Sequence, residues 1–187
     1  MANGEFLGNQ LLIAMPALGD PNFHRTVTII CEHSAEGALG IILNRPSGMS
    51  LDQILEQLSL KAVSPAIGDQ PVLSGGPVQQ ERGFVLHEPA GEWDSTLEVS
   101  DEIRVTTSRD ILSAMALGTG PRRAIVALGY AGWEAGQLEA EIRANAWLSA
   151  PASSEIVFEL PFEQRWAAAT NLLGIDPARL SGQAGHA

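Results

Sequence analysis

The segment from Leu128 to Ile142 constrains the fold more tightly than any other part of the sequence. Residues 123–131 form the most apolar run of the chain, which predicts a buried, central β-strand. Glycines between positions 129 and 136 then predict a turn, because glycine adopts backbone angles that other residues avoid. Apolar side chains recur at helical spacing over residues 134–144 and predict an amphipathic helix. The segment therefore specifies a strand, a turn and a covering helix.

The rest of the chain mixes hairpins with single helices. Alternating apolar and polar residues predict a strand over 25–33, which Gly37 turns back into a second strand over 38–44. A capping box at Ser50–Gln53 predicts a helix over 51–58. Further strands are expected at 10–15, 71–74, 83–87, 97–99, 102–106 and 155–159, an exposed loop with Trp93 at 88–96, and further helices at 109–117, capped by Ser108, and at 162–173.

Together these elements predict an α/β (α+β) fold. We expect a single domain over residues 1–187, with a mixed, largely antiparallel sheet flanked by helices. Strands and helices do not alternate from the start of the chain, so a regular doubly wound sheet is not predicted. Residues 181–187 are small and polar, and we expect them to form a disordered tail.

Charge and cysteine content narrow the function classes. The chain has 22 acidic and 11 basic residues, and its formal net charge is −11. Nucleic acids and anionic membranes are bound through cationic surfaces, so we expect neither direct DNA binding nor membrane binding. The single cysteine excludes an internal disulfide framework and suits a reducing compartment. There is no basic signal-peptide region and no run long enough to span a membrane, so we expect a cytoplasmic protein.

Four ordered blocks of the sequence are similar to those of one bacterial protein family. The blocks are residues 11–16 with Phe23, Thr26 and Val27; residues 37–46; residues 75–78 with 83–87; and residues 129–133 with 136–139 and 145–148. In this order and spacing the chain resembles the AlgH/YqgE family over about residues 8–175. The resemblance implies a single-domain, cytosolic α/β protein.

The same resemblance says little about mechanism. Some members of the family are labelled transcriptional regulators because of a genetic link to alginate production. The resemblance implies no particular reaction, cofactor or DNA-binding element, so it transfers a label and not a mechanism. Any regulatory role of this chain is therefore expected to be indirect.

Glycines and aromatic residues gather at two expected turns, and these are the candidate binding surfaces. Residues 75–77, Gly-Gly-Pro, either join two strands in a tight turn or let a ligand approach the backbone. Residues 129–136 either hold structural glycines or present backbone N–H groups to an anion at a helix N-terminus, although Glu134 would repel that anion. The candidate ligand- or partner-binding residues are Asn44, Gly75, Gly76, Pro77, His87, Tyr130, Gly132, Trp133 and Gln137.

Two polar clusters have competing interpretations. Gln137 and Glu141 lie one helical turn apart and could form a polar rim beside Tyr130 and Trp133, or simply a solvated helix face. Four arginines could gather on one surface and bind an acidic partner, or could lie apart and pair with nearby carboxylates; they are Arg104, Arg109, Arg122 and Arg123.

Groups that carry out catalysis or bind metals are not arranged in a known pattern. Ser74 precedes its glycines and so does not form a nucleophile elbow, and no phosphate-binding loop is present. Cys31 and His33 share one face of a strand and could bind a metal, but Cys31 also shares that face with apolar residues and is expected to be a small buried hydrophobe. His33 is expected to be an exposed turn residue. We therefore expect no catalytic residue, metal or cofactor.

Two functions remain open from the sequence. The first is a non-catalytic regulatory or interaction protein that acts through a protein partner or a small ligand. The alternative is an enzyme or small-ligand sensor with a pocket near the two glycine-rich turns. As an enzyme, it would assemble its pocket from distant residues such as Asp20, His24, Asn44 and His87. The oligomeric state is left open.

Overall fold

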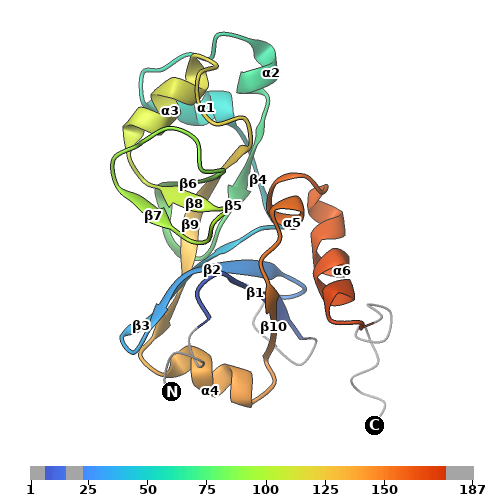
Figure 1. The fold of residues 1–187 in the computed structure, drawn as a ribbon. Helices are drawn as coiled ribbons and strands as arrows, with labels where there is room; N and C mark the ends of the chain where they lie inside the picture. The colour runs from blue at the N-terminus through green and yellow to red at the C-terminus, as the bar shows by residue number, and fades with distance from the viewer. Residues whose placement is uncertain (1–6, 16–22, 176–187) are drawn as a thin grey trace.

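A computed structural model describes residues 7–15 and 23–175 of the chain, and Figure 1 shows its arrangement. The strands are β1 (Gln10–Ala14), β2 (Val27–Ser34), β3 (Gly37–Ile42), β4 (Pro46–Ser50), β5 (Pro71–Ser74), β6 (Val78–His87), β7 (Thr96–Glu98), β8 (Arg104–Thr106), β9 (Ala124–Glu134) and β10 (Trp147–Pro151). The helices are α1 (Leu51–Gln57), α2 (Pro65–Gly68), α3 (Arg109–Ala116), α4 (Gln137–Arg143), α5 (Ser154–Phe158) and α6 (Phe162–Leu172).

Strand β9 organises the sheet. The strand order is β10-β1-β2-β3-β9-β6-β8-β7, and β4 and β5 form a branch that joins β9. One edge of β9 pairs with β6, while its other edge is divided between β3, near the C-terminal end, and β5. The β5–β9 pair is parallel and the other pairs are antiparallel. The predicted mixed, largely antiparallel sheet flanked by helices is confirmed.

The divided edge of β9 depends on two glycines between β5 and β6. The Gly75 N–H donates to the Leu128 carbonyl at 2.7 Å, and the Gly75 carbonyl accepts from the Ile42 N–H at 2.9 Å. A Cβ on Gly75 would overlap the Gly129 carbonyl, and one on Gly76 would overlap the Tyr130 carbonyl. Glycine is required because the two stretches of backbone touch. Residues 75–77 are thus a crossing over β9 and more than a turn between strands.

Helices cover the sheet in three groups, as Figure 1 shows. Helices α1, α2 and α3 lie together at one end, where α1 and α3 pack on one face of β5, β6 and β9. Helices α5 and α6 lie beside the strands at the N-terminus, with α6 against β1 and β2. Helix α4 closes the opposite end against β3, β9 and β10. Because each group buries one apolar surface, the core divides into three clusters.

The two helices predicted to begin at a serine, α1 and α3, are capped in different ways. Helix α1 begins as expected, with the Ser50 N–H donating to Gln53 Oε1 at 2.9 Å. Ser108 stands at the start of α3, but its hydroxyl lies against Asp94 and Asp110, and Asp110 instead accepts from the Ile111 N–H at 2.8 Å. Ser108 is therefore the N-cap residue of α3 by its backbone, but the side chain that accepts from a first-turn N–H is the carboxylate of Asp110.

Two predictions about local structure are wrong. The predicted strand at 155–159 is helix α5 (Ser154–Phe158), because Ser153 caps it by accepting from the Ile156 N–H and the apolar pair at 156–157 packs as one helical face. The glycine-rich segment 129–136 is not one turn. Strand β9 continues to Glu134 because β3 pairs with it, and the turn is confined to residues 135–136.

Helix α6 is fastened by a buried arginine that sequence reasoning missed. Arg165 is 2% exposed; its Nη1 donates to the Leu43 carbonyl at 2.8 Å and its Nε to the Leu160 carbonyl at 3.0 Å. Its guanidinium also lies 4.8 Å from the centre of the Phe162 ring. Burial lowers the pKa of Arg165 to about 10, so the group stays charged near neutral pH. Two carbonyls at helix and strand ends are thereby satisfied.

The part of the chain that the structure describes contains no helix long and apolar enough to cross a membrane. The predicted tail at residues 181–187 lies outside the described residues.

Replacing Gly76 with alanine should destabilise the protein strongly. The added methyl group would overlap the backbone of Tyr130, so β9 or the crossing must move, at a cost of about 3 kcal/mol in the free energy of unfolding. Gly83→Ala is the matched control, because a Cβ there has no atom within 4 Å and alanine should change stability by less than about 1 kcal/mol. Urea unfolding of both variants tests this, and equal stabilities would refute the close-approach argument.

Candidate functional site

A groove at one end of the sheet collects four of the predicted site residues, Tyr130, Gly132, Trp133 and Gln137. It has a volume of about 540 Å³ and lies at the free end of the β2–β3 hairpin, beside the C-terminal part of β9 and the start of α4. Its lining is Glu32, Ser34, Glu36, Gly37, Ala38, Leu39, Val78, Tyr130, Gly132, Trp133, Glu134 and Gln137. This volume lies within the range of about 300–1,000 Å³ that is usual for small-ligand sites.

The floor of the groove is open at Gly132, which carries no side chain and pairs with Leu39 of β3. Gly37 pairs with Glu134, but glycine is needed there for a different reason, because a Cβ would overlap the Trp133 carbonyl. Tyr130 lies on the same face and forms one wall, with its ring edge-on to Phe84 at 5.7 Å between centroids. A Cβ on Gly132 would meet only the Tyr130 ring, so its side-chain space opens into the groove.

A β-bulge directs one carboxylate into this groove. The pairing of β2 with β3 shifts between Ile30 and Glu32, so that Glu32 pairs with Leu39 and Cys31 is the extra residue. Bulges re-aim side chains in this way. The regular alternation of the sequence places Glu32 on the face opposite Cys31, and therefore could not reveal its place in the groove.

The charge of the groove is negative. Glu32, Glu36 and Glu134 contribute three carboxylates, and none of the lining residues named above is a lysine or arginine. None of the three carboxylates forms an ion pair with another described residue. Carboxylates at the edge of a concave surface concentrate negative potential there and attract cationic groups.

A carboxylate on α4 holds the floor in place. Glu141 Oε1 accepts from the indole N–H of Trp133 at 3.0 Å and from that of Trp147 at 2.9 Å, while Oε2 accepts from Gln137 Nε2 at 2.8 Å. Gln137 Oε1 in turn accepts from the Glu134 N–H at 2.9 Å. The predicted polar rim therefore exists, but it is a supporting network and not a free helix face.

Trp133 belongs to the core more than to the surface. It is 6% exposed, and its ring lies 5.9 Å from that of Trp147 and 6.2 Å from that of Phe23, measured between centroids. Trp133 lines the groove, but its ring is held in place by contacts with the core. Tyr130 is the aromatic residue whose ring is partly exposed at the groove.

His33 ties the end of β2 to α4, and the prediction that it is exposed is wrong. Its side chain is fully buried; Nδ1 accepts from the Leu7 N–H at 2.8 Å and Nε2 lies 3.3 Å from Glu139 Oε1. The pKa of Glu139 is held below its usual value, first by its own backbone N–H and then also by His33. The hairpin that forms one side of the groove is thereby fixed to the helix on the other.

The remaining predicted site residues lie elsewhere. Gly76 and Pro77 line a separate hollow of about 50 Å³, and Gly75 is buried in the crossing over β9. Asn44 Oδ1 accepts from the Val27 N–H at 3.0 Å and its Nδ2 donates to the Arg25 carbonyl at 2.9 Å. Asn44 therefore holds the backbone that leads into β2.

His87 is buried at the other end of the sheet. Its Nδ1 donates to the Glu88 carbonyl at 2.7 Å, so Nε2 accepts from the Thr106 hydroxyl, also at 2.7 Å. Burial lowers the pKa of His87. The residues suggested for an enzymatic pocket are not joined by hydrogen bonds among the described residues: Asn44 and His87 bond to different groups, His24 is exposed, and Asp20 lies outside the described residues.

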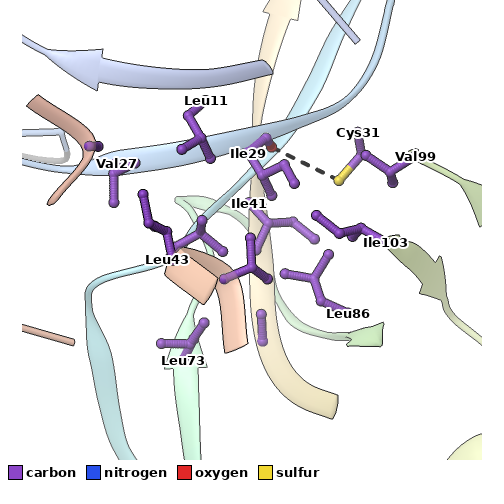
Figure 2. Close-up of a cluster of buried hydrophobic side chains, with 14 of the residues drawn as sticks. Leu11, Val27, Ile29, Cys31, Ile41, Leu43, Leu73, Leu86, Val99 and Ile103 are labelled. Atoms are coloured by element: carbon purple, nitrogen blue, oxygen red, sulfur yellow. Dashed lines mark hydrogen bonds between the residues drawn. The ribbon is translucent and has the colours of Figure 1, made fainter. Parts of the chain in front are cut away.

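Cys31 is a core residue, as Figure 2 shows. It is 5% exposed among Ile29, Val99 and Ile103, with its thiol directed to the Ile29 carbonyl at 3.9 Å. Burial, reinforced by the charge of Glu32, raises the pKa of the Cys31 thiol to about 12. Over residues 7–15 and 23–175, no group of three or more His, Cys, Asp or Glu side chains is arranged to hold a metal ion.

The side chains of three of the four arginines singled out above have partners among the described residues, and these partners differ. Arg104 pairs with Glu98 at 3.7 Å, and Arg123 pairs with Glu88 at 3.5 Å and with Glu159 at 2.7 Å. Arg109 Nη2 donates to the Leu58 carbonyl. Glu98 faces Arg104 across the β7–β8 pair, whereas Glu88 and Glu159 are each more than 30 residues from Arg123 and were not predictable as its neighbours.

The sheet and the groove together define a mixed α/β protein with an acidic, ligand-sized groove beside its central strand. Comparison with known proteins places it more closely. The profile of the AlgH-like family matches residues 11–178. A UPF0301 protein of Nitrosococcus oceani is 57% identical over 97% of both chains, and one of Methylococcus capsulatus is 55% identical over 99% of this chain and 98% of that one. The chain belongs to the AlgH-like family.

Solved structures agree with this assignment. The solution structure of the AlgH protein from Pseudomonas aeruginosa is 51% identical to this chain, covers 97% of it and 96% of that chain, and superimposes with a TM-score of 0.81. A crystal structure of the protein DIP2367 from Corynebacterium diphtheriae, 20% identical, gives a TM-score of 0.69 over 88% of this chain and 86% of that one. The second likeness shows a shared fold alone.

Replacing Glu141 with glutamine should lower the free energy of unfolding by about 1–3 kcal/mol. The new amide group would face the Gln137 amide as a second donor, or would turn toward the two indole N–H groups, so at least one donor loses its acceptor. Glu56→Gln, on the exposed face of α1, is the control and should be neutral. Urea titration followed by tryptophan fluorescence measures both, and equal unfolding midpoints would contradict the network.

His87 should make stability fall at mildly acid pH. Because its pKa is lower in the folded protein than the value of about 6.5 in the unfolded chain, the unfolded state takes up the proton first as pH falls. The free energy of unfolding should therefore decline below about pH 6.5, and less steeply in His87→Gln than in the unchanged protein. Urea unfolding at pH 7.5, 6.5 and 5.5 gives the comparison, and parallel declines would show that His87 does not contribute.

Proposed function

We propose that this protein is a non-catalytic, cytoplasmic interaction protein that binds a protein partner in its acidic groove. The observation that carries the proposal is the groove itself: three carboxylates that form no ion pair with another described residue surround an open floor at Gly132, and the partly exposed ring of Tyr130 forms a wall. Lysine or arginine side chains of a partner fit such a surface, through ion pairs with the carboxylates and contact with the ring.

The surrounding network supports this proposal because it makes the groove rigid before binding. Glu141 fixes two tryptophans and Gln137, and His33 fixes the hairpin to α4. A preformed groove loses less conformational entropy when a partner binds. Under this proposal a regulatory role would be indirect, through the partner, since a groove of this charge repels the phosphates of DNA.

Two variants of the groove test the proposal by affinity capture from the native lysate. Gly132→Leu fills the floor, and the triple variant Glu32→Gln, Glu36→Gln, Glu134→Gln removes its charge. A triple control, Glu56→Gln, Glu92→Gln, Glu163→Gln, removes as much charge at exposed positions outside the groove. Trp133→Ala is not a suitable test, because loss of a buried tryptophan costs about 3–5 kcal/mol of stability.

One protein should be retained by the unchanged chain and by the triple control, and lost from both groove variants. Its binding to the unchanged chain, measured with purified components, should weaken by more than tenfold between 50 and 500 mM salt, since ion pairs at an exposed surface are screened. Retention of the same partner by both groove variants would refute the groove as its site. Retention of a small molecule in place of a protein would favour a ligand sensor.

A further inference from the structure

A second hollow lies on the other side of the Val78–Gly83 segment from the acidic groove, and it differs in character. It is a cleft of about 380 Å³ between α1 and α3, over β6 and β9. Its inner lining is apolar and comes from four elements: Met49, Ile54, Leu58, Leu112 and Leu128. We propose that this cleft binds a small amphiphilic molecule that has an aliphatic or aromatic body and one anionic group.

A missing side chain keeps the cleft open. Gly83 of β6 pairs with Leu128 of β9, and the side chains of paired residues in an antiparallel sheet share one face. A Cβ on Gly83 would have no atom within 4 Å, so this strand position points into empty space at the cleft. Two residues further along, Val85 pairs with Val126 on the same face, and both are buried in the core beneath α3. The apolar packing beneath α3 therefore ends at Gly83, and the cleft begins there.

One cation stands at the rim without a carboxylate partner among the described residues. Arg109 Nη2 donates to the Leu58 carbonyl at 2.6 Å, which holds the guanidinium between the end of α1 and the start of α3. The remaining donors of its guanidinium form no hydrogen bond with another described residue. A carboxylate, sulfonate or phosphate group of a ligand suits these donors.

The other rim groups agree with a single anionic group placed at Arg109. Gln57, Gln80, Thr107 and Ser108 line the rim and are uncharged. Glu81 is the one carboxylate of the lining; it is exposed and belongs to β6, so it repels an anion from the strand side of the cleft. The volume of the cleft, about 380 Å³, lies within the usual range of small-ligand sites.

Two fluorescent probes separate the apolar and the anionic parts of this proposal. 8-Anilinonaphthalene-1-sulfonate has an aromatic body with one sulfonate, and N-phenyl-1-naphthylamine has the same body without the charge. Each is titrated against the full chain and three variants: Gly83→Phe fills the cleft, Arg109→Gln removes its cation, and Gly132→Leu fills the acidic groove and leaves the cleft unchanged. Near-ultraviolet circular dichroism and urea midpoints show that each variant is folded.

The unchanged chain should bind both probes at one site. Gly83→Phe should weaken both by more than tenfold without loss of stability, because the ring fills space that no atom occupies. Arg109→Gln should weaken the sulfonate about fivefold, as expected for loss of about 1 kcal/mol from an exposed charged contact, and the neutral probe less than twofold. Gly132→Leu should change neither.

Other results would overturn the proposal. If Gly83→Phe binds both probes as tightly as the unchanged chain does, the cleft is not their site. If Arg109→Gln weakens both probes equally, or neither, the assignment of the anionic group to Arg109 is wrong. Loss of probe binding in Gly132→Leu would place the probes in the acidic groove. Failure of the partner-capture experiment would leave these outcomes unaffected, since the cleft and the groove share no lining residue.

Discussion

The contact between the Gly75–Gly76 backbone and β9 is the constraint on which the rest of the structure depends. It divides one edge of β9 between β3 and the parallel strand β5, and so joins two sheets into one. Both hollows adjoin this junction. The acidic groove lies beside the part of β9 that pairs with β3, and the apolar cleft lies over the pair formed by Leu128 of β9 and Gly83 of β6.

Irregular strands create the sites on this frame. The bulge at Cys31 brings Glu32 into the groove while the thiol stays in the core. In β6 the pairing shifts between Val78 and Gly83, so that Val78 lines the groove whereas Gln80 and Gly83 line the cleft. A regular ladder would have kept these residues in alternation and left two flat surfaces. The acidic groove and the apolar cleft thus lie where the strand pairing is irregular.

The two sites favour opposite kinds of ligand, and this follows from where charges are already balanced. Most arginines bind carbonyls or carboxylates within the fold, as Arg123 and Arg165 do. Glu141 and Glu139 are likewise satisfied, by indole and amide N–H groups and by His33. At the groove, Glu32, Glu36 and Glu134 form no ion pair with another described residue, and the same is true of Arg109 at the cleft. Buried polar groups hold the structure, and the unpaired ones at open surfaces are available for binding.

Local patterns in the sequence determined the fold class, the β2–β3 hairpin, the helices α1, α3 and α6, and the burial of Cys31 and the central strand, because period and capping are properties of neighbouring residues. The sequence also marked Tyr130, Gly132 and Gln137, which do meet in one groove. Helix α5 was missed although its cap at Ser153 is local, because its apolar pair at 156–157 fits a strand as well until the core is assembled. Only the tertiary structure decided that β9 continues to Glu134 and that His33 is buried. These two outcomes depend on β3 and α4, which are distant in sequence, and no local pattern records which distant segments will meet.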